Sequence, residues 1–236
     1  MDGHCCDGQE GMTEDSLKWD RMAVEAESRS SIYGFLSLVF GKEPSVELIR
    51  LMRGRQIEEL LTRLGHRISF DEVEGSEEDL LEELVLEYTR LFLGPDPHIS
   101  PHESVHRKDE KSPGLFWGDS TVDVKKFIEW IGLSYNREYH GIPDHISVEF
   151  ELMQKLTAKE KEGWQDEDTE TACICLEYER RFMEEHLLKW VPEFCDQVAG
   201  RTRVSFYREL AIFTKEFLLL ESEHVSVNPT QGPKRA

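Results

Sequence analysis

Apolar residues recur every three or four positions along most of this chain, a spacing that places side chains on one face of an α-helix. The pattern is clearest over 76–92, where Ser76 can cap the first turn and Asp79 stands at the third following position. Gly94 and Pro95 then end the helix. No run of residues alternates between apolar and polar as a half-buried strand would. The sequence therefore predicts an all-α fold.

The same spacing predicts about nine to ten helices in all. Besides 76–92, the predicted ranges are 17–40, 46–52, 57–64, 120–133, 143–162, 169–190, 191–198 and 204–221.

Residues 94–119 interrupt the helical pattern with four prolines and three glycines. A loop of this length inside a compact chain is commonly functional or a hinge. We therefore place the boundary between two helical subdomains, 16–112 and 113–222, in this Pro-rich loop. Two further segments are predicted to lie outside the folded part: a disordered N-terminus (1–15) and a mobile tail (223–236).

The chain is strongly acidic, with 48 Asp and Glu against 28 Lys and Arg and a net charge of −20. Such a surface repels phosphate backbones and anionic lipid and suits a cationic partner, so nucleic acid and membrane surfaces are not expected as partners. No apolar run has the length of about 18 residues that a membrane span needs. The N-terminus lacks the basic start and apolar stretch of an export signal, so a soluble, cytoplasmic protein is expected.

The cysteines number five, an odd count that favours reduced thiols over a disulfide framework. They are Cys5, Cys6, Cys173, Cys175 and Cys195. The spacing of Cys173 and Cys175 is too tight for the usual Cys-x-x-Cys zinc or redox site, and the pair beside His4 is a weak signal for metal binding.

Histidines form another candidate site, because three of them are spaced by four around the Pro-rich loop. They are His98, His102 and His106, with Glu103 among them. On a helix this spacing would place the imidazoles on one face, as metal binding requires, but Pro101 disfavours a helix there. The alternatives are a metal site and a polar loop with ordinary histidines; we expect no metal.

Asp144 and His145 follow Pro143 at a predicted helix start, where an acid can simply cap the helix or form a charged rim beside a groove. Glu149 and Glu103 would extend this rim if the two segments meet. The aromatic pair Phe116-Trp117 at the end of the loop is expected either in the core or as a loop anchor or pocket wall, and Trp130 is expected in the core.

Four stretches in a fixed order carry a family resemblance. They are EYTRLFLGP at 87–95, SPHESV at 100–105, IPDHISVE at 142–149 and HLLKWVPEF at 186–194. Together they resemble the TorD/DmsD/NarJ family, cytoplasmic chaperones for molybdopterin enzymes that carry twin-arginine export signals. The order and spacing match across about 85–220.

The resemblance implies an all-helical protein with a hinge near the Pro-rich loop, no catalysis and no cofactor, existing as a monomer or a homodimer. The implied partners are the apo catalytic subunit of an exported molybdopterin oxidoreductase and its twin-arginine leader. The peptide-binding residues carried over are Tyr88, Leu91, Phe92, Pro101, Glu103, Ser104, Asp144 and His145. Some members have proline or an aromatic residue where His102 stands, which bears on loop packing and peptide selectivity.

A physical reading of this site assigns the two leader arginines to the carboxylates of Asp144 and Glu103. The apolar stretch of the leader would lie in a groove lined by Leu91 and Phe92 and supply most of the affinity.

Two alternatives stay open. One is an acidic helical adaptor whose binding does not depend on the arginines. The other is a metal-dependent helical hydrolase that uses His98, His102, His106 or His145.

Overall fold

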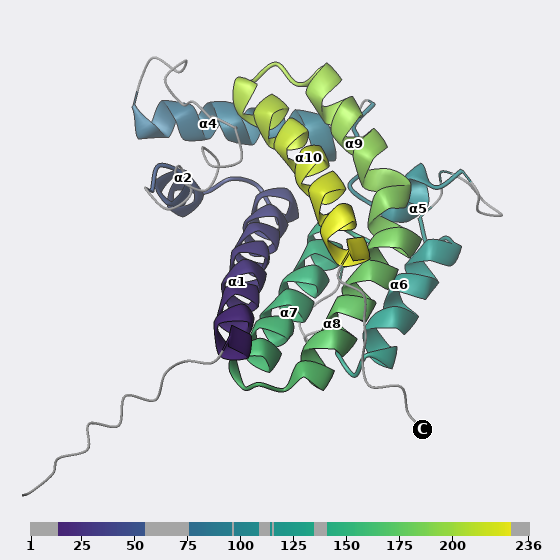
Figure 1. Cartoon of the computed structure of the whole chain (residues 1–236). Helices are drawn as coiled ribbons and strands as arrows, with labels where there is room; N and C mark the ends of the chain where they lie inside the picture. Colours follow the sequence, from purple (N-terminus) through teal and green to yellow (C-terminus); the bar gives the residue numbers. More distant parts are fainter. Residues whose placement is uncertain are drawn as a thin grey trace, which may run out of the picture.

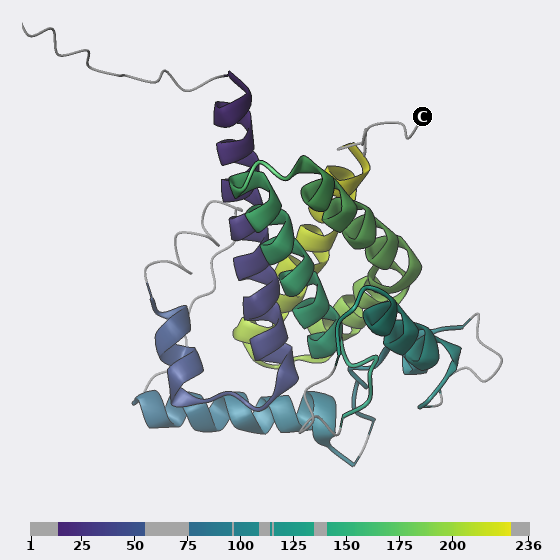
Figure 2. The same cartoon turned by 90° about the horizontal axis from the view of Figure 1, so that it is seen from below.

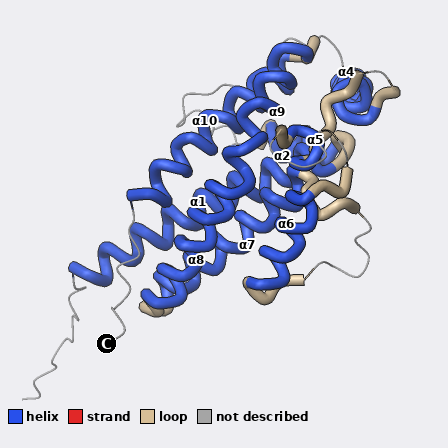
Figure 3. Tube along the Cα trace, turned by 90° about the vertical axis from the view of Figure 1, so that its right-hand side faces the viewer, coloured by secondary structure: helices blue, strands red, loops and turns tan. Residues whose placement is uncertain are grey.

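The computed structural model describes residues 14–54, 76–95, 97–108, 114, 116–134 and 141–227. Within these ranges it contains helices and no strand, which confirms the predicted all-α class (Figure 3). The predicted helix at 57–64 lies outside the described residues, as do Cys5 and Cys6.

The helices follow one another along the chain as Figure 1 labels them. They are α1 (Glu14–Gly41), α2 (Val46–Met52), α4 (Glu77–Tyr88) with the π-helical turn η1 (Thr89–Leu93), α5 (Glu103–His106), α6 (Asp119–Trp130), α7 (Ile146–Gln165), α8 (Thr169–Phe182) with the π-helical turn η2 (Met183–Leu187), α9 (Leu188–Arg201) and α10 (Ser205–Val227).

The start of α4 forms as the sequence predicts. The Ser76 hydroxyl accepts a hydrogen bond from the Asp79 N–H at 3.2 Å, and the Asp79 carboxylate accepts one from the Ser76 N–H at 2.7 Å. This reciprocal capping box satisfies two backbone donors that the first helical turn leaves free.

Three boundaries differ from the prediction. The predicted helices 169–190 and 191–198 are one continuous run from α8 through η2 to the end of α9, and Pro192 lies inside it. The last helix continues past 221 to Val227, because Val225 still packs inward with 3% of its surface exposed. Residues 223–227 are therefore helical and do not belong to the mobile tail that was predicted for 223–236. The Pro-rich loop is not wholly irregular, since it contains the short helix α5.

The core lies between α1, α7, α8, α9 and α10, while α4 runs across the end of α1 (Figures 1 and 2). Helices α7 and α8 approach closely at Gly163, where a Cβ atom would come within 2.8 Å of the Ala172 nitrogen. One apolar cluster joins Tyr33 with Phe150 and Tyr207, and therefore contains residues from both sides of the Pro-rich loop. The division into two subdomains stays a prediction.

A buried ionic cluster connects four of these helices. The Arg29 guanidinium of α1 donates to Glu160 of α7 at 2.7 Å, to Glu221 of α10 at 2.8 Å, and to Glu179 of α8. All four side chains are 7% exposed or less. Because buried charges are stable only when paired, this cluster fixes how the four helices meet.

Candidate functional site

Backbone hydrogen bonds join the Pro-rich loop to the segment before α7. The Pro101 carbonyl accepts from the first N–H of α7 at 2.9 Å, and the Glu103 N–H donates to the Asp144 carbonyl at 3.0 Å. Between these bonds, His102 and His145 form a single antiparallel β-bridge. Five of the predicted site residues thereby meet in one junction: Pro101, Glu103, Ser104, Asp144 and His145.

Asp144 is fully buried in this junction, with none of its surface exposed. Its Oδ2 accepts the Ser104 N–H at 2.8 Å, so the side chain caps α5 across 40 residues of sequence. Its Oδ1 and the Ser104 hydroxyl have no hydrogen-bond partner among the described residues. The sequence allowed Asp144 to be either a helix cap or part of a charged rim, and its contacts are those of a helix cap. The helix that Asp144 caps is α5, and not α7, which follows it in the sequence.

Glu103 is the second buried acid of the junction and also has no exposed surface. One carboxylate oxygen accepts from Arg107 at 2.6 Å, and the other lies 2.8 Å from Nδ1 of His186 in η2. The carboxylate is therefore already paired with the cation at the C-terminal cap of its own helix. Arg107 and His186 are partners that the sequence did not suggest.

Glu149 lies behind Glu103 in the first turn of α7 and is also fully buried. The Trp190 indole N–H donates to it at 3.1 Å. Burial raises the pKa of Glu149 well above its ordinary value, and the nearby Glu103 raises it further. The predicted acidic rim thus exists as a group of three acids inside the protein, and not on an open edge.

The histidines act as structural residues in this junction. Burial, followed by the neighbouring His102, lowers the pKa of His145 to about 3, and Nδ1 of His145 accepts the Ser147 N–H at 3.2 Å. Burial also lowers the pKa of His106, whose ring stacks on Trp190 with centroids 5.3 Å apart. His98 is exposed. No three His, Cys, Asp or Glu side chains within the described ranges are placed to hold a metal ion.

The predicted apolar residues lie in the core, and not along an open groove. Tyr88, Leu91 and Phe92 are each 3% exposed or less. The Tyr88 hydroxyl donates to the Phe40 carbonyl at 3.0 Å, and the Phe92 ring lies 5.9 Å from that of Phe194. The sequence led us to expect that Leu91 and Phe92 line an open groove. In the structure, neighbouring aromatic rings pack against these side chains and leave them buried. Their peptide-binding role stays a prediction.

The hydrogen bonds of Glu87 give the EYTR stretch at 87–90 a structural role. Its carboxylate accepts from Arg90 at 2.7 Å, from the Thr202 hydroxyl at 2.9 Å and from the Arg203 N–H at 2.6 Å. These bonds attach the end of α4 to the turn between α9 and α10, and the Arg90 pair lowers the pKa of Glu87.

Three aromatic side chains near the junction are exposed to solvent. They are Phe116 (49%), Trp117 (63%) and Trp130 (58%), so none of them lies in the core, and Trp130 lines the pocket described below. Two of the described cysteines, Cys175 and Cys195, are buried. Burial raises the pKa of the Cys175 thiol to about 12. A thiol with so high a pKa is a poor nucleophile or metal ligand.

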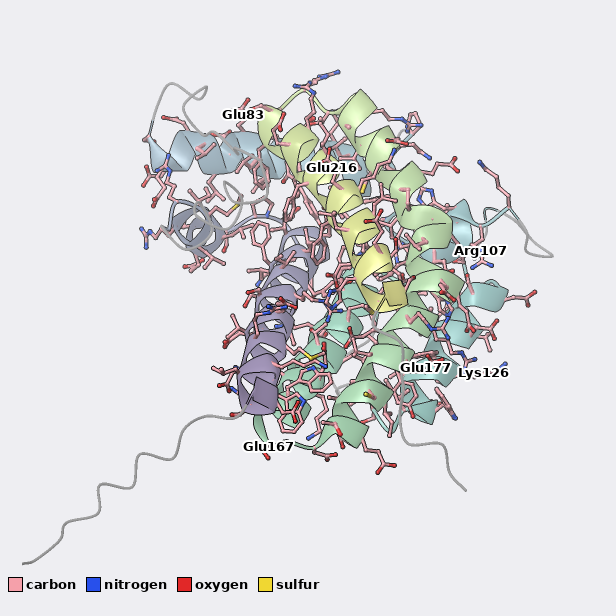
Figure 4. The ribbon with its side chains drawn as sticks, viewed as in Figure 1. Glu83, Arg107, Lys126, Glu167, Glu177 and Glu216 are labelled. Carbon is pink, nitrogen blue, oxygen red and sulfur yellow. The ribbon has the colours of Figure 1, made fainter. Side chains whose placement is uncertain are left out.

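A pocket of about 980 Å³ opens beside the junction, between α6 and the run from η2 into α9. We call it the α6 pocket. Arg107 and His186 line it, so the two partners of the buried Glu103 form part of its wall. Figure 4 places Arg107 and Lys126, another lining residue, on the same side of the molecule. The buried carboxylate of Glu103 therefore lies directly behind the wall of an open pocket.

Replacing Asp144 with alanine is expected to lower the free energy of unfolding by about 1–3 kcal/mol, because the Ser104 N–H loses its buried acceptor. Urea unfolding followed by circular dichroism measures the change. Asp123→Ala is the matched control, because that side chain is 60% exposed and its loss should cost less than about 0.5 kcal/mol. Equal stability of the Asp144→Ala variant and the wild type would contradict the capping role.

The described residues form a helical bundle, and the one β-bridge among them lies at the junction. Residues 52–196 match the nitrate reductase delta subunit family, and the chain belongs to that family. No helix in the described ranges combines the length and the apolar character that a membrane crossing needs.

Named relatives match along most of the chain. The chaperone protein TorD of Vibrio vulnificus is 24% identical over 210 residues, covering 84% of this chain and 95% of the relative. TorD of Vibrio atlanticus is 25% identical, with 85% and 95% covered. The perchlorate reductase assembly chaperone protein of Dechloromonas aromatica is 26% identical over 124 residues, which is 52% of each chain.

A solved structure supports the fold. An Archaeoglobus fulgidus protein assigned to redox enzyme maturation superposes with a TM-score of 0.51 and 22% identity, covering 81% of this chain and 93% of that one.

Proposed function

We propose that this protein is a cytoplasmic maturation chaperone for a molybdopterin oxidoreductase. It binds the twin-arginine leader and the apo form of the catalytic subunit, holds them during cofactor insertion and assembly, and then releases the subunit for export. The observation that carries the proposal is the match to TorD chaperones, which extends over 95% of their length. A binding role, and not catalysis, also agrees with the buried, paired state of the acids and histidines at the junction.

The charge of the chain suits such a client. A net charge of −20 attracts a leader that begins with basic residues and speeds the encounter. Most of the affinity should come from burying the apolar stretch of the leader, because ion pairs exposed to water each contribute about 0–1 kcal/mol.

Isothermal titration of the full chain with a synthetic twin-arginine leader tests the proposal. The arginine leader is expected to bind at least about tenfold more tightly than the same peptide with two lysines, because only the guanidinium can form bidentate bonds with a carboxylate. Equal affinity for the two peptides would instead support the acidic adaptor. No binding of either peptide, and none of an apo molybdoenzyme subunit, would contradict the chaperone proposal.

A further inference from the structure

The α6 pocket is a concave feature beside the junction, and acids, cations and two aromatic rings form its wall. Its volume of about 980 Å³ is at the upper end of the range typical of ligand sites. The lining residues used below are Asp119, Asp123, Trp130, Arg181, Glu184 and Glu185. They come from α6, the end of α8 and η2, so folding alone brings them together.

One wall of the pocket already holds a guanidinium group. The Arg181 guanidinium lies 5.1 Å from the Trp130 ring centroid and 5.6 Å from that of Phe127, and its Nε donates to Glu185 at 2.8 Å. An aromatic face with a carboxylate beside it is the environment in which arginine binds most favourably. Because 58% of Trp130 is exposed, the ring also offers surface to an incoming side chain.

The charges that line the pocket balance one another, so the field of the whole chain decides which ligand charge is favoured. Four carboxylates and four cations line it, and the buried Glu103 lies behind Arg107 as a fifth carboxylate. Ion pairs join Arg107 to Glu103, Lys126 to Asp123, Arg181 to Glu185 and, from outside the pocket, Arg180 to Glu184. The Glu184 and Glu185 side chains are nevertheless 50% and 49% exposed, so a second guanidinium can still reach their carboxylates. The chain as a whole adds the field of its −20 charge, which attracts cations and repels anions.

An apolar platform stands at the N-terminal end of α6. Phe116 and Trp117 are 49% and 63% exposed, and Trp117 has a positive φ of 64°. This conformation is costly for a bulky residue and persists only where the surroundings hold it. Trp117 stands two residues before Asp119, which lines the pocket, so the platform adjoins the pocket mouth.

We propose that the α6 pocket receives the arginine pair of the client leader, while Phe116 and Trp117 hold the apolar stretch that follows. This assignment rests on the proposed function and gives it a location. The leader arginines pair with Glu184 and Glu185 and stack on Trp130, and the buried junction positions the pocket wall through Glu103 and His186. Asp144 and Glu103 therefore support the site from behind.

The test compares two double variants that change the net charge equally. Glu184→Gln/Glu185→Gln removes two pocket carboxylates, and Glu82→Gln/Glu83→Gln removes two exposed carboxylates of α4. Glu83 lies at the opposite end of the molecule from Lys126 in Figure 4. Calorimetric titration with the arginine leader is expected to give about tenfold weaker binding for the pocket variant and a change of less than about twofold for the control.

A third variant, Trp130→Leu, probes the aromatic face without changing charge and is also expected to weaken the arginine leader several-fold. Thermal unfolding of each variant checks that the fold is retained. If the wild type prefers the arginine leader but all variants bind it equally, the pocket assignment is wrong and the chaperone function stands. If the wild type itself does not distinguish arginine from lysine, the leader-binding function is wrong.

Discussion

Replacing Arg29 with methionine is expected to lower the free energy of unfolding by about 3–5 kcal/mol. Methionine fills a similar volume, so the loss comes from charge and hydrogen bonds and not from a cavity. In the wild type, one guanidinium pairs with Glu160, Glu179 and Glu221, which come from three other helices. Without Arg29, three buried carboxyl groups would face one another with no cation between them.

Urea unfolding at pH 7 measures this loss. Arg21→Met, on the same helix, is the matched control, because the Arg21 side chain is 83% exposed and its nearest carboxylate lies 3.8 Å away. Its removal should change stability by less than about 0.5 kcal/mol. Similar stability of the two variants would mean that the buried cluster does not hold the four helices together.

The same cluster is expected to make stability depend on pH through Glu179. Burial raises the pKa of Glu179 to about 8, an increase that Glu160 and Glu221 favour and Arg29 opposes. Glu179 binds its proton more tightly in the folded state than in the unfolded chain, where its pKa is near 4.5. Its contribution to stability is therefore complete below about pH 4.5 and is lost as the pH rises toward 8. The stability advantage of wild type over Glu179→Gln should therefore fall between about pH 5 and 8.

The expected slope of that difference is at most about 1.4 kcal/mol per pH unit, which corresponds to one proton. Other groups near the cluster are Tyr33, Cys175 and His224. Burial lowers the pKa of His224 to about 4, which gives the opposite slope below about pH 6.5. Comparing wild type with Glu179→Gln removes this common contribution. A difference that stays constant from pH 5 to 8 would show that Glu179 binds no extra proton in the folded state.

The sequence predicted the helices well where local signals determine them. Ser76 and Asp79 form the expected capping box, and the helix 46–52 has the predicted bounds. The helix after residue 169 was divided wrongly at Trp190, because Pro192 reads as a break while the packing of buried Val191 and Phe194 keeps the helix continuous. Tertiary contacts, which have no local signal, decided that boundary.

The ionic cluster was missed for a similar reason. Arg29 stands between Ala26 and Tyr33 on the apolar face of its helix, which was the one sequence sign that it would be buried. Its three glutamates lie 131 to 192 residues away, and nothing local distinguishes them from the many exposed acids.

The candidate site was predicted in part. The sequence left open whether the 100–105 stretch meets 142–149, and the structure joins the two stretches through the hydrogen bond between Glu103 and Asp144. The short motifs could not indicate that these acids are buried, since burial depends on Arg107, His186 and Trp190 from other elements. The α6 pocket combines residues from 107 to 189, so only the folded structure could bring it to attention.

Capture of a client from cells tests the chaperone proposal most directly. The tagged full chain is expressed with the complete precursor of an exported molybdopterin oxidoreductase subunit, either with its own leader or with lysines in place of the two arginines. The proposal predicts that the chain recovers the apo precursor with the arginine leader, and recovers much less of the lysine form and of the cofactor-loaded enzyme. Recovery that is equal for all three, or absent for all three, would contradict it.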